Sequence, residues 1–264
     1  MMPQRLPRLR LLRKTLLAAT FILSALLPFP AVATTYFSGV IAGNVVWTKE
    51  ESPYIIGYIS VPVGASLTIL PGTIVKVPRG AESAPLLVYG TLTVGLPGNT
   101  EFVTVTSLED DSVGGDTNKD GTGTTPVPGS WTNITAESGG AVSINRTAFS
   151  YGGARVAYNY YCVHARCGYQ YFASSQLFNN GGTLTVASSI FEHTAESHIA
   201  QSSGVSHVAD TDLVGAPLAV VADGGLLTLL RDHFFSNTRG FNVSRTTLAL
   251  ASNIFVDTPT NDFD

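Results

Sequence analysis

The chain has 264 residues, of which 44% are hydrophobic and 13% are charged, with 15 basic and 19 acidic residues and a formal net charge of −4. This length and composition allow one domain with a long continuous core. The excess of acidic residues excludes nucleic acid and anionic lipid as expected partners, because like charges repel.

Residues 1–33 predict an export signal and not a part of the fold. Five basic residues precede an apolar run at residues 16–27, which is too short to span a bilayer. Ala31 and Ala33 supply the small side chains of a cleavage site, so we expect a mature chain that starts near Thr34. An uncleaved N-terminal anchor is the alternative.

Export has two consequences. The expected location is secreted or at the cell surface, with no transmembrane span once the signal is removed. The signal contains 5 of the 15 basic and none of the 19 acidic residues, so the mature chain carries 10 against 19, a net charge of −9.

Residues 34–60 are expected to form an N-terminal cap and the first strands of a solenoid. Residues 40–47 and 54–61 are rich in β-formers, and a polar stretch at residues 49–53 interrupts them. A cap is expected because an open coil would expose strand edges and apolar ends.

A short repeated pattern begins near Leu67 and continues to the last residues of the chain. Two apolar residues spaced by two are followed by a small or polar residue and then by another apolar residue, which predicts a strand, a bend and a return to the core. The copies are aligned on Phe149, Phe191, Leu213, Phe234 and Phe255, so their intervals are 42, 22, 21 and 21.

We interpret the first interval as two periods of 21. A fixed period of this length predicts a solenoid, and strands this short predict a right-handed parallel β-helix with rungs of about 21–25 residues. The β-helix is expected to cover residues 61–264, with Phe149, Phe191, Phe234 and Phe255 in one interior column.

The pattern stops at residues 107–131, which are acidic and glycine-rich and end in a proline-containing stretch. We expect a long loop that leaves the coil and returns at Trp131. Loops of this length in compact domains are usually functional or flexible.

Three segments carry a resemblance to a known class. They are Trp47-Thr48-Lys49, residues 64–73 (Gly-Ala-Ser-Leu-Thr-Ile-Leu-Pro-Gly-Thr) and residues 110–121 of the acidic loop. Over residues 40–153 the chain resembles secreted bacterial right-handed parallel β-helix proteins of the pectin-lyase-like superfamily, which include adhesin-like surface proteins. The resemblance implies the fold and export, but not an activity, because this fold carries lyases, hydrolases, adhesins and stalks.

The loop contains a sequence typical of calcium ligands, Asp116-x-Asn118-x-Asp120-Gly121, with Thr122 placed to offer a backbone carbonyl. Position twelve is Val127, so the bidentate glutamate of an EF-hand is absent. Either a structural Ca²⁺ pins the loop, or the loop is an acidic turn held by Asx hydrogen bonds. No organic cofactor is expected. Residues that could complete the calcium shell are Glu109, Asp110 and Asp111.

Residues 155–172 contain five of the ten tyrosines and both cysteines of the chain. Cys162 and Cys167 are expected to form a small disulfide loop in an exported protein. The tyrosines either form a platform that stacks on sugar rings or a partner surface, or pack over a degenerate coil. They are Tyr158, Tyr160, Tyr161, Tyr169 and Tyr171.

One period relates Asp210 to Arg231 and Asp212 to His233, so each pair is expected about one strand spacing apart, near 4.8 Å. Acid, arginine and histidine on one face could serve a polysaccharide lyase or hydrolase. The motifs of pectate lyases and polygalacturonases are not found, and surface ion pairs are the ordinary explanation.

The sequence therefore predicts an exported cell-surface or extracellular β-helix scaffold that binds glycan or another macromolecule without catalysis. The alternatives are a polysaccharide lyase or glycoside hydrolase of the same fold, and an inert structural spacer.

Overall fold

The structure, a computed structural model, describes residues 34–80, 86–155 and 174–258, together with the backbone alone at residues 157–163, 166–171 and 262–263. The predicted export signal lies outside the described residues. No helix in the described part is long and apolar enough to cross a membrane.

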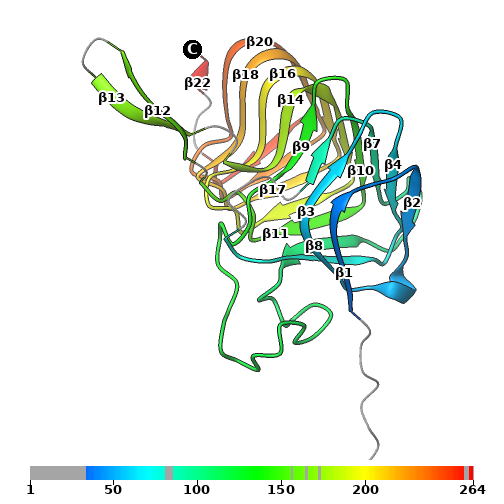
Figure 1. Cartoon of the computed structure of the whole chain (residues 1–264). Coiled ribbons are helices and arrows are strands. Elements are labelled where there is room, and N and C mark those ends of the chain that lie inside the picture. The colour runs from blue at the N-terminus through cyan, green and yellow to red at the C-terminus, as the bar shows by residue number, and fades with distance from the viewer. Residues whose placement is uncertain are drawn as a thin grey trace, which may run out of the picture. The chain divides into compact units, whose positions relative to one another are not determined.

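The described chain is a right-handed parallel β-helix, as predicted (Figure 1). One short 3-10 helix, η1 (Lys49–Glu51), interrupts the first strands. The strands are β1 (Thr35–Val40), β2 (Asn44–Trp47), β3 (Tyr54–Val61), β4 (Ser66–Ile69), β5 (Ile74–Val77), β6 (Leu86–Val88), β7 (Thr91–Val94), β8 (Val103–Ser107), β9 (Ile134–Glu137), β10 (Ala141–Asn145), β11 (Thr147–Ser150), β12 (Ala157–Val163), β13 (Arg166–Tyr171), β14 (Ser175–Ala187), β15 (Ile190–Glu192), β16 (Ser197–Ala209), β17 (Asp212–Val214), β18 (Leu218–Leu230), β19 (His233–Phe235), β20 (Phe241–Ala251), β21 (Ile254–Val256) and β22 (Asp262–Phe263).

The parallel pairings define three faces. Face 1 contains β2, β4, β7 and β10, followed by the second halves of β14, β16, β18 and β20. Face 2 contains the first halves of β1 and β3, followed by β5, β8, β11, β15, β17, β19 and β21. Face 3 contains the second halves of β1 and β3, then β6, β9, the first halves of β14, β16, β18 and β20, and β22. Each long strand therefore bends from face 3 into face 1.

The predicted interior column is present on face 2. Register places Phe149, Phe191, Leu213, Phe234 and Phe255 directly over one another. The rings of Phe149 and Phe191 stack with centroids 4.7 Å apart, and those of Phe234 and Phe255 stack at 4.5 Å. The first four side chains are fully buried, whereas Phe255 is 38% exposed on the last described coil.

The interpretation of the first interval as two periods is wrong. Phe149 pairs directly with Phe191, so the 42 residues between them form a single coil. The additional length is the antiparallel hairpin β12–β13, which forms a separate two-stranded sheet. The hairpin begins and ends at the same corner of the coil, so it lengthens the interval between equivalent residues without adding a coil. The length of the interval therefore predicts one coil too many.

From β10 onward, each described coil turns from face 1 to face 2 through one residue in the left-handed region. In Arg146, Ser188, Asp210, Arg231 and Ser252 the φ angle lies between 43° and 57°. Such a bend turns the backbone within one residue but leaves N–H groups facing inward, and these groups need acceptors.

The polar residues that follow three of these bends, Ser189, Asp232 and Asn253, supply such acceptors. Oδ1 of Asn253 accepts a hydrogen bond from the backbone N–H of Asp232 at 2.8 Å, and Oδ1 of Asp232 accepts one from the N–H of Thr211 at 3.0 Å. The polar position of the repeat is thus an internal ladder that joins successive coils, and this explains why small polar residues recur there.

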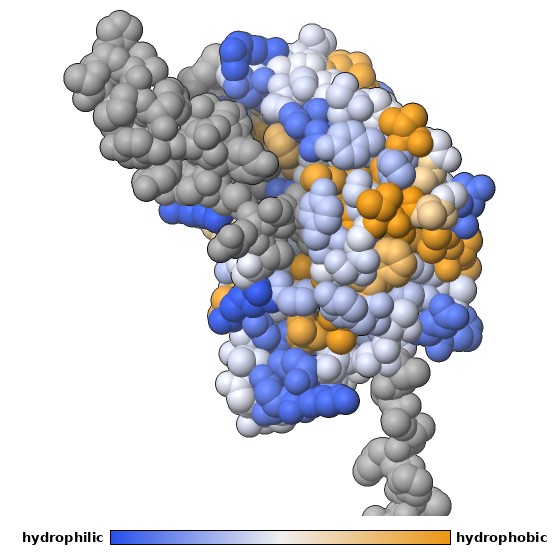
Figure 2. Space-filling model, in the orientation of Figure 1, coloured by the Kyte–Doolittle hydropathy of each residue, from blue (hydrophilic) through white to orange (hydrophobic). Residues whose placement is uncertain are grey.

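Residues 34–60, the predicted cap, form the first coil itself: β1 pairs with β3, and β2 pairs with β4. Figure 2 shows hydrophobic residues gathered on the side of β2 and β4, where Val46 is 52% and Val63 is 82% exposed. Whether this segment acts as a cap stays a prediction.

Candidate binding and metal sites

The two long excursions from the coil leave at the same corner, between face 2 and face 3. The acidic loop joins β8 to β9, and the hairpin joins β11 to β14 one coil later (Figure 1). Their bases are hydrogen bonded, since the N–H of Gly129 donates to the carbonyl of Gly152 at 3.1 Å and the N–H of Ala154 donates to that of Trp131 at 2.9 Å. We call this corner the excursion corner, and it is where the candidate sites concentrate.

A buried lysine fixes the base of the acidic loop. Lys76 in β5 has no exposed surface, and its ammonium donates to the backbone carbonyls of Asp110 at 2.9 Å and Gly115 at 2.7 Å. Burial lowers the pKa of Lys76, while the charges of Asp110, Asp111 and Asp116 oppose that shift. The loop is therefore anchored to the coil wall by a cation that the sequence alone did not single out.

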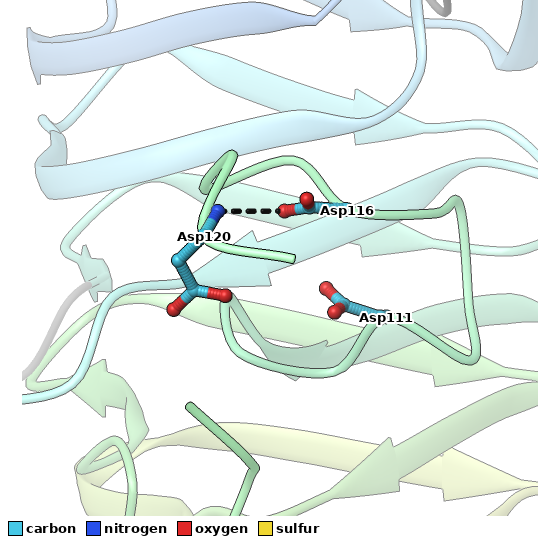
Figure 3. A group of neighbouring side chains, drawn as sticks. All are labelled: Asp111, Asp116 and Asp120. Atoms are coloured by element: carbon cyan, nitrogen blue, oxygen red, sulfur yellow. Dashed lines mark hydrogen bonds between the residues drawn. The ribbon is translucent and has the colours of Figure 1, made fainter. Parts of the chain in front are cut away.

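Three of the predicted metal ligands come together at the loop tip. Asp111, Asp116 and Asp120 each place a carboxylate oxygen within 4.8 Å of the others, and the three carboxylates face one shared space (Figure 3). The carboxylate of Asp116 accepts hydrogen bonds from the N–H groups of Asp120 at 3.2 Å and Gly121 at 2.9 Å. The Asx-type turn of the alternative interpretation is therefore also present.

Two oxygens at this tip are buried without a hydrogen-bond partner, namely Oδ1 of Asp111 and Oδ1 of Asn118. A buried acceptor that lacks a donor is costly, and hard cations such as Ca²⁺ are bound by carboxylate and amide oxygens. The donor set at the tip thus fits Ca²⁺, with Asp111, Asp116, Asn118 and Asp120 as the residues that would hold it.

The other predicted calcium ligands have different roles in the structure. Oε1 of Glu109 forms an ion pair with Nε of Arg79 at 3.1 Å. Its other oxygen, Oε2, accepts hydrogen bonds from the hydroxyl groups of Ser107 and Ser130. The carboxylate of Asp110 accepts from Thr106 at 2.7 Å and from Ser112 at 2.5 Å. Thr122 lies on the exposed part of the turn.

The hairpin register sorts the tyrosines between two faces. Tyr160 pairs with Tyr169 across β12–β13, and Tyr171 follows Tyr169 by two residues, so these three positions share one face of the ribbon. Tyr161 pairs with Gly168 and belongs to the opposite face. Tyr158 falls within the bulge between Ala157 and Asn159.

Cys162 and Cys167 are register partners in the same hairpin. Directly opposed residues in an antiparallel pair have Cα atoms about 4.5–5.5 Å apart, which lies within the range for disulfides. The backbone geometry is therefore compatible with the predicted disulfide, which stays a prediction.

The structure brings together both predicted ion pairs on neighbouring coils. Arg231 donates two hydrogen bonds of 2.6 Å to the carboxylate of Asp210, and Nδ1 of His233 lies 2.9 Å from Oδ1 of Asp212. The hydrogen bonds from Arg231 lower the pKa of Asp210. All four side chains are 40% exposed or more, so the pairs contribute little to stability.

A groove of about 410 Å³ lies beside the hairpin, along the excursion corner of later coils. Its charged lining residues are Arg155, Glu196 and Arg239. Arg155 precedes β12, whereas Glu196 and Arg239 come from turns of two later coils. Arg155 belongs to the base of the hairpin and lies outside the repeat, so the period does not predict that it lies near Glu196 and Arg239.

No protein-family model, curated protein or solved structure matches this chain. The β-helix fold by itself does not select a function, because unrelated functions share it. The function must be inferred from the geometry of the excursion corner.

Proposed function

We propose that this protein is an exported β-helix scaffold of the pectin-lyase-like type that binds glycan through the tyrosine-bearing face of hairpin β12–β13. The observation that carries the proposal is the register, which assigns Tyr160, Tyr169 and Tyr171 to one face of a ribbon outside the coil. Tyrosine offers a large flat surface with a polar hydroxyl at low entropic cost, as sugar recognition requires.

The rest of the chain supports this role by holding the ribbon in place. The coil is stabilised by parallel strand pairing and by a buried core that continues from β1 to β20. Binding elements are commonly borne by excursions on such a rigid frame. Export and display at a surface belong to the same proposal.

Tyr160→Ala and Tyr169→Ala are each expected to weaken binding to a glycan-array hit about fivefold to tenfold. Losing one aromatic contact costs about 1–1.5 kcal/mol, which corresponds to that change. The measurement is titration of the purified mature chain with the array hit, before and after each substitution.

Tyr161→Ala is the matched control, because this residue lies on the opposite face of the same strand. Its affinity is expected to stay within twofold of the wild-type value. Equal losses for Tyr161→Ala and Tyr160→Ala would contradict a one-sided platform. Absence of any glycan binding would favour the inert spacer.

The enzymatic alternative depends on Asp212 and His233, which form a close pair beside Arg231 and Asp210. Incubation with acidic polysaccharides would reveal a lyase by unsaturated products and a hydrolase by new reducing ends. Activity abolished by Asp212→Ala or His233→Ala would replace the scaffold proposal by an enzymatic one.

We also propose that the acidic loop binds a structural Ca²⁺, on the basis of the unpartnered oxygens of Asp111 and Asn118 beside the carboxylates of Asp116 and Asp120. A ligand at 100 times its dissociation constant stabilises the folded state by about 2.7 kcal/mol. Adding Ca²⁺ after EGTA treatment is therefore expected to raise the Tm by about 5–10 °C in differential scanning calorimetry.

Asp111→Asn is expected to abolish most of this calcium-dependent rise, because the side chain keeps its shape and loses its charge. Asp223→Asn serves as the control, since this exposed carboxylate pairs with Arg245 on β20, away from the loop. A Tm that is the same in EGTA and in Ca²⁺ would remove the metal from the proposal.

A further inference from the structure

A buried cation lies beneath the part of the acidic loop that carries the predicted metal ligands. Val75 points into the core and pairs with Val105, which pairs with Phe149, so the next residue, Lys76, lies on the outer side of face 2. Lys76 is nevertheless buried, because the loop covers it. A buried ammonium is costly unless its charge and its donors are satisfied, so its partners in the loop explain why it lies there.

The two carbonyl groups that accept from Lys76 occupy equivalent places in the loop. Nζ of Lys76 lies 2.9 Å from the carbonyl oxygen of Asp110 and 2.7 Å from that of Gly115. Each carbonyl belongs to the peptide group that leads directly into a predicted ligand, Asp111 or Asp116. A peptide group is planar, so holding its oxygen restricts the position of the next Cα atom. One ammonium therefore sets the separation between two of the metal-binding residues.

Further contacts hold the segment between these two carbonyls against the coil. Thr106, the register partner of Lys76 on the next coil, donates from its hydroxyl to the carboxylate of Asp110 at 2.7 Å. Gly114 has a φ of 68°, and a Cβ atom there would lie 2.7 Å from Cγ of Pro53. Figure 3 shows the chain doubling back within this segment, so that the carboxylates on its two arms face one space. The coil wall, and not the loop alone, therefore determines the geometry of the segment.

The charge of Lys76 and its position have opposite effects on a calcium site. Burial lowers the pKa of Lys76, and the charges of Asp111 and Asp116 oppose that shift, so the ammonium and these carboxylates interact. A cation that close to the ligands repels Ca²⁺. If charge were its main effect, removal of the ammonium would tighten calcium binding. If the position of the ligands is its main effect, removal weakens calcium binding.

We propose that Lys76 is the positioning residue of the calcium site, and that its ammonium holds Asp111 and Asp116 within reach of one cation. This inference rests on the proposed calcium site and adds the residue that determines its affinity. Groups that hold metal ligands in place commonly contribute about 10–100-fold to metal affinity. Lys76 acts through the ligands, because it contacts the backbone of the loop and carries a positive charge.

The first variant is Lys76→Met, which keeps the length of the side chain and removes the ammonium. Isothermal titration of the mature chain with CaCl₂ is expected to give a dissociation constant about 10–100 times higher than that of the wild type. Arg79→Gln is the matched control, because Arg79 also donates to a loop carbonyl, that of Thr125 at 3.1 Å, which does not adjoin a ligand. Its affinity is expected to stay within about threefold of the wild-type value.

Terbium luminescence provides a readout of the ligands themselves. Tb³⁺ binds at oxygen-rich calcium sites, and its luminescence lifetimes in H₂O and D₂O report the number of bound waters. At saturating Tb³⁺, Lys76→Met is expected to show about one or two more bound waters than the wild type, because water replaces a carboxylate that no longer reaches the ion. Arg79→Gln is expected to keep the wild-type number.

Gly114→Ala tests the position of the segment without changing any charge. The added Cβ would collide with Pro53, and a calcium-free loop can relieve the collision by lifting, whereas a loop held by the ion cannot. Calcium affinity is therefore expected to fall about tenfold. Gly98→Ala is the control, since Gly98 has a φ of 75° and nothing within 4 Å of the added atom. It introduces comparable backbone strain and is expected to leave calcium affinity unchanged.

The outcomes separate this inference from the calcium proposal. If Lys76→Met binds Ca²⁺ as tightly as the wild type or more tightly, the positioning role is wrong and the calcium site stands. Equal losses for Lys76→Met and Arg79→Gln would also overturn the positioning role. If Lys76→Met does not fold, Gly114→Ala decides, because an unchanged affinity overturns the inference and a tenfold loss supports it. A wild-type chain that binds neither Ca²⁺ nor Tb³⁺ overturns the calcium site together with this inference.

Discussion

Asp232→Asn is expected to raise the stability of the folded chain by about 3 kcal/mol at pH 8 and to lower it by about 1 kcal/mol at pH 4. Asp232 has no exposed surface, and burial raises the pKa of its carboxyl to about 7. The shift from 3.8 corresponds to a cost on the order of 4 kcal/mol when the carboxylate is charged inside the fold.

The direction of the pH dependence follows from proton binding. Between about pH 4 and pH 7 the folded chain retains a proton on Asp232 that the unfolded chain has released. The contribution of this carboxyl to stability therefore falls as pH rises through that window and is constant above it. The asparagine variant has no such titration and should lack this fall.

The ladder of polar residues already contains an asparagine at the position equivalent to Asp232. Asn253 occupies the equivalent position one coil later, where its Oδ1 accepts from the N–H of Asp232 and its Nδ2 donates to the carbonyl of Leu229 at 2.9 Å. The bond from the N–H of Leu230 to Oδ2 of Asp232 would be lost, at about 1 kcal/mol. This loss brings the expected gain down to about 3 kcal/mol, or about 6–12 °C in Tm.

Thermal unfolding of the two proteins from pH 4 to pH 8 measures the effect. Asp223→Asn is the control with the opposite sign, because hydrogen bonds from Arg245 and Ser244 lower the pKa of that exposed carboxyl to about 2. Parallel stability curves for wild type and Asp232→Asn across this range would show that Asp232 does not titrate near neutrality.

Phe191→Ala is expected to destabilise the chain by about 3–5 kcal/mol, because it opens a cavity in the middle of the interior column. Phe191 is fully buried, stacks on Phe149 with ring centroids 4.7 Å apart and lies 5.9 Å from the ring of His198. Leu213 covers it from the next coil. A shift in the urea midpoint with an unchanged m-value would measure the loss.

Phe255→Ala is the matched control in the same column. Phe255 stacks on Phe234 but is 38% exposed, so its removal leaves a partly solvated gap and should cost clearly less. Equal losses for Phe191→Ala and Phe255→Ala would show that position along the column does not determine the energetic contribution of a ring.

The repeat was readable from the sequence because each copy encodes one local event. A strand, a one-residue bend and a polar residue at the corner follow from apolar spacing and from small polar side chains, as at Thr211 and Asn253. Stacked pairs such as Asp212 and His233 follow by simple addition of the period once the coils are in register. The predicted fold and both ion pairs therefore depended on short-range information.

The interval that contains the hairpin is predicted as two coils because the periodic pattern carries only this short-range information. Its length of 42 residues is a multiple of 21, and only the pairing of Phe149 with Phe191 reveals one coil with an excursion. The face assignment of Tyr160 and Tyr161 likewise depends on cross-strand register, which composition cannot give.

The amino-acid sequence by itself determined the β-helix, the interior phenylalanine column and the acidic loop with its calcium-like spacing, because these depend on residues a few positions apart. Only the tertiary structure decided that the loop, the hairpin and the groove share one corner, that Lys76 anchors the loop, and that Arg155 and Arg239 meet in one groove. Those contacts join residues tens of positions apart, and their distances are fixed by how each coil is stacked on the previous one.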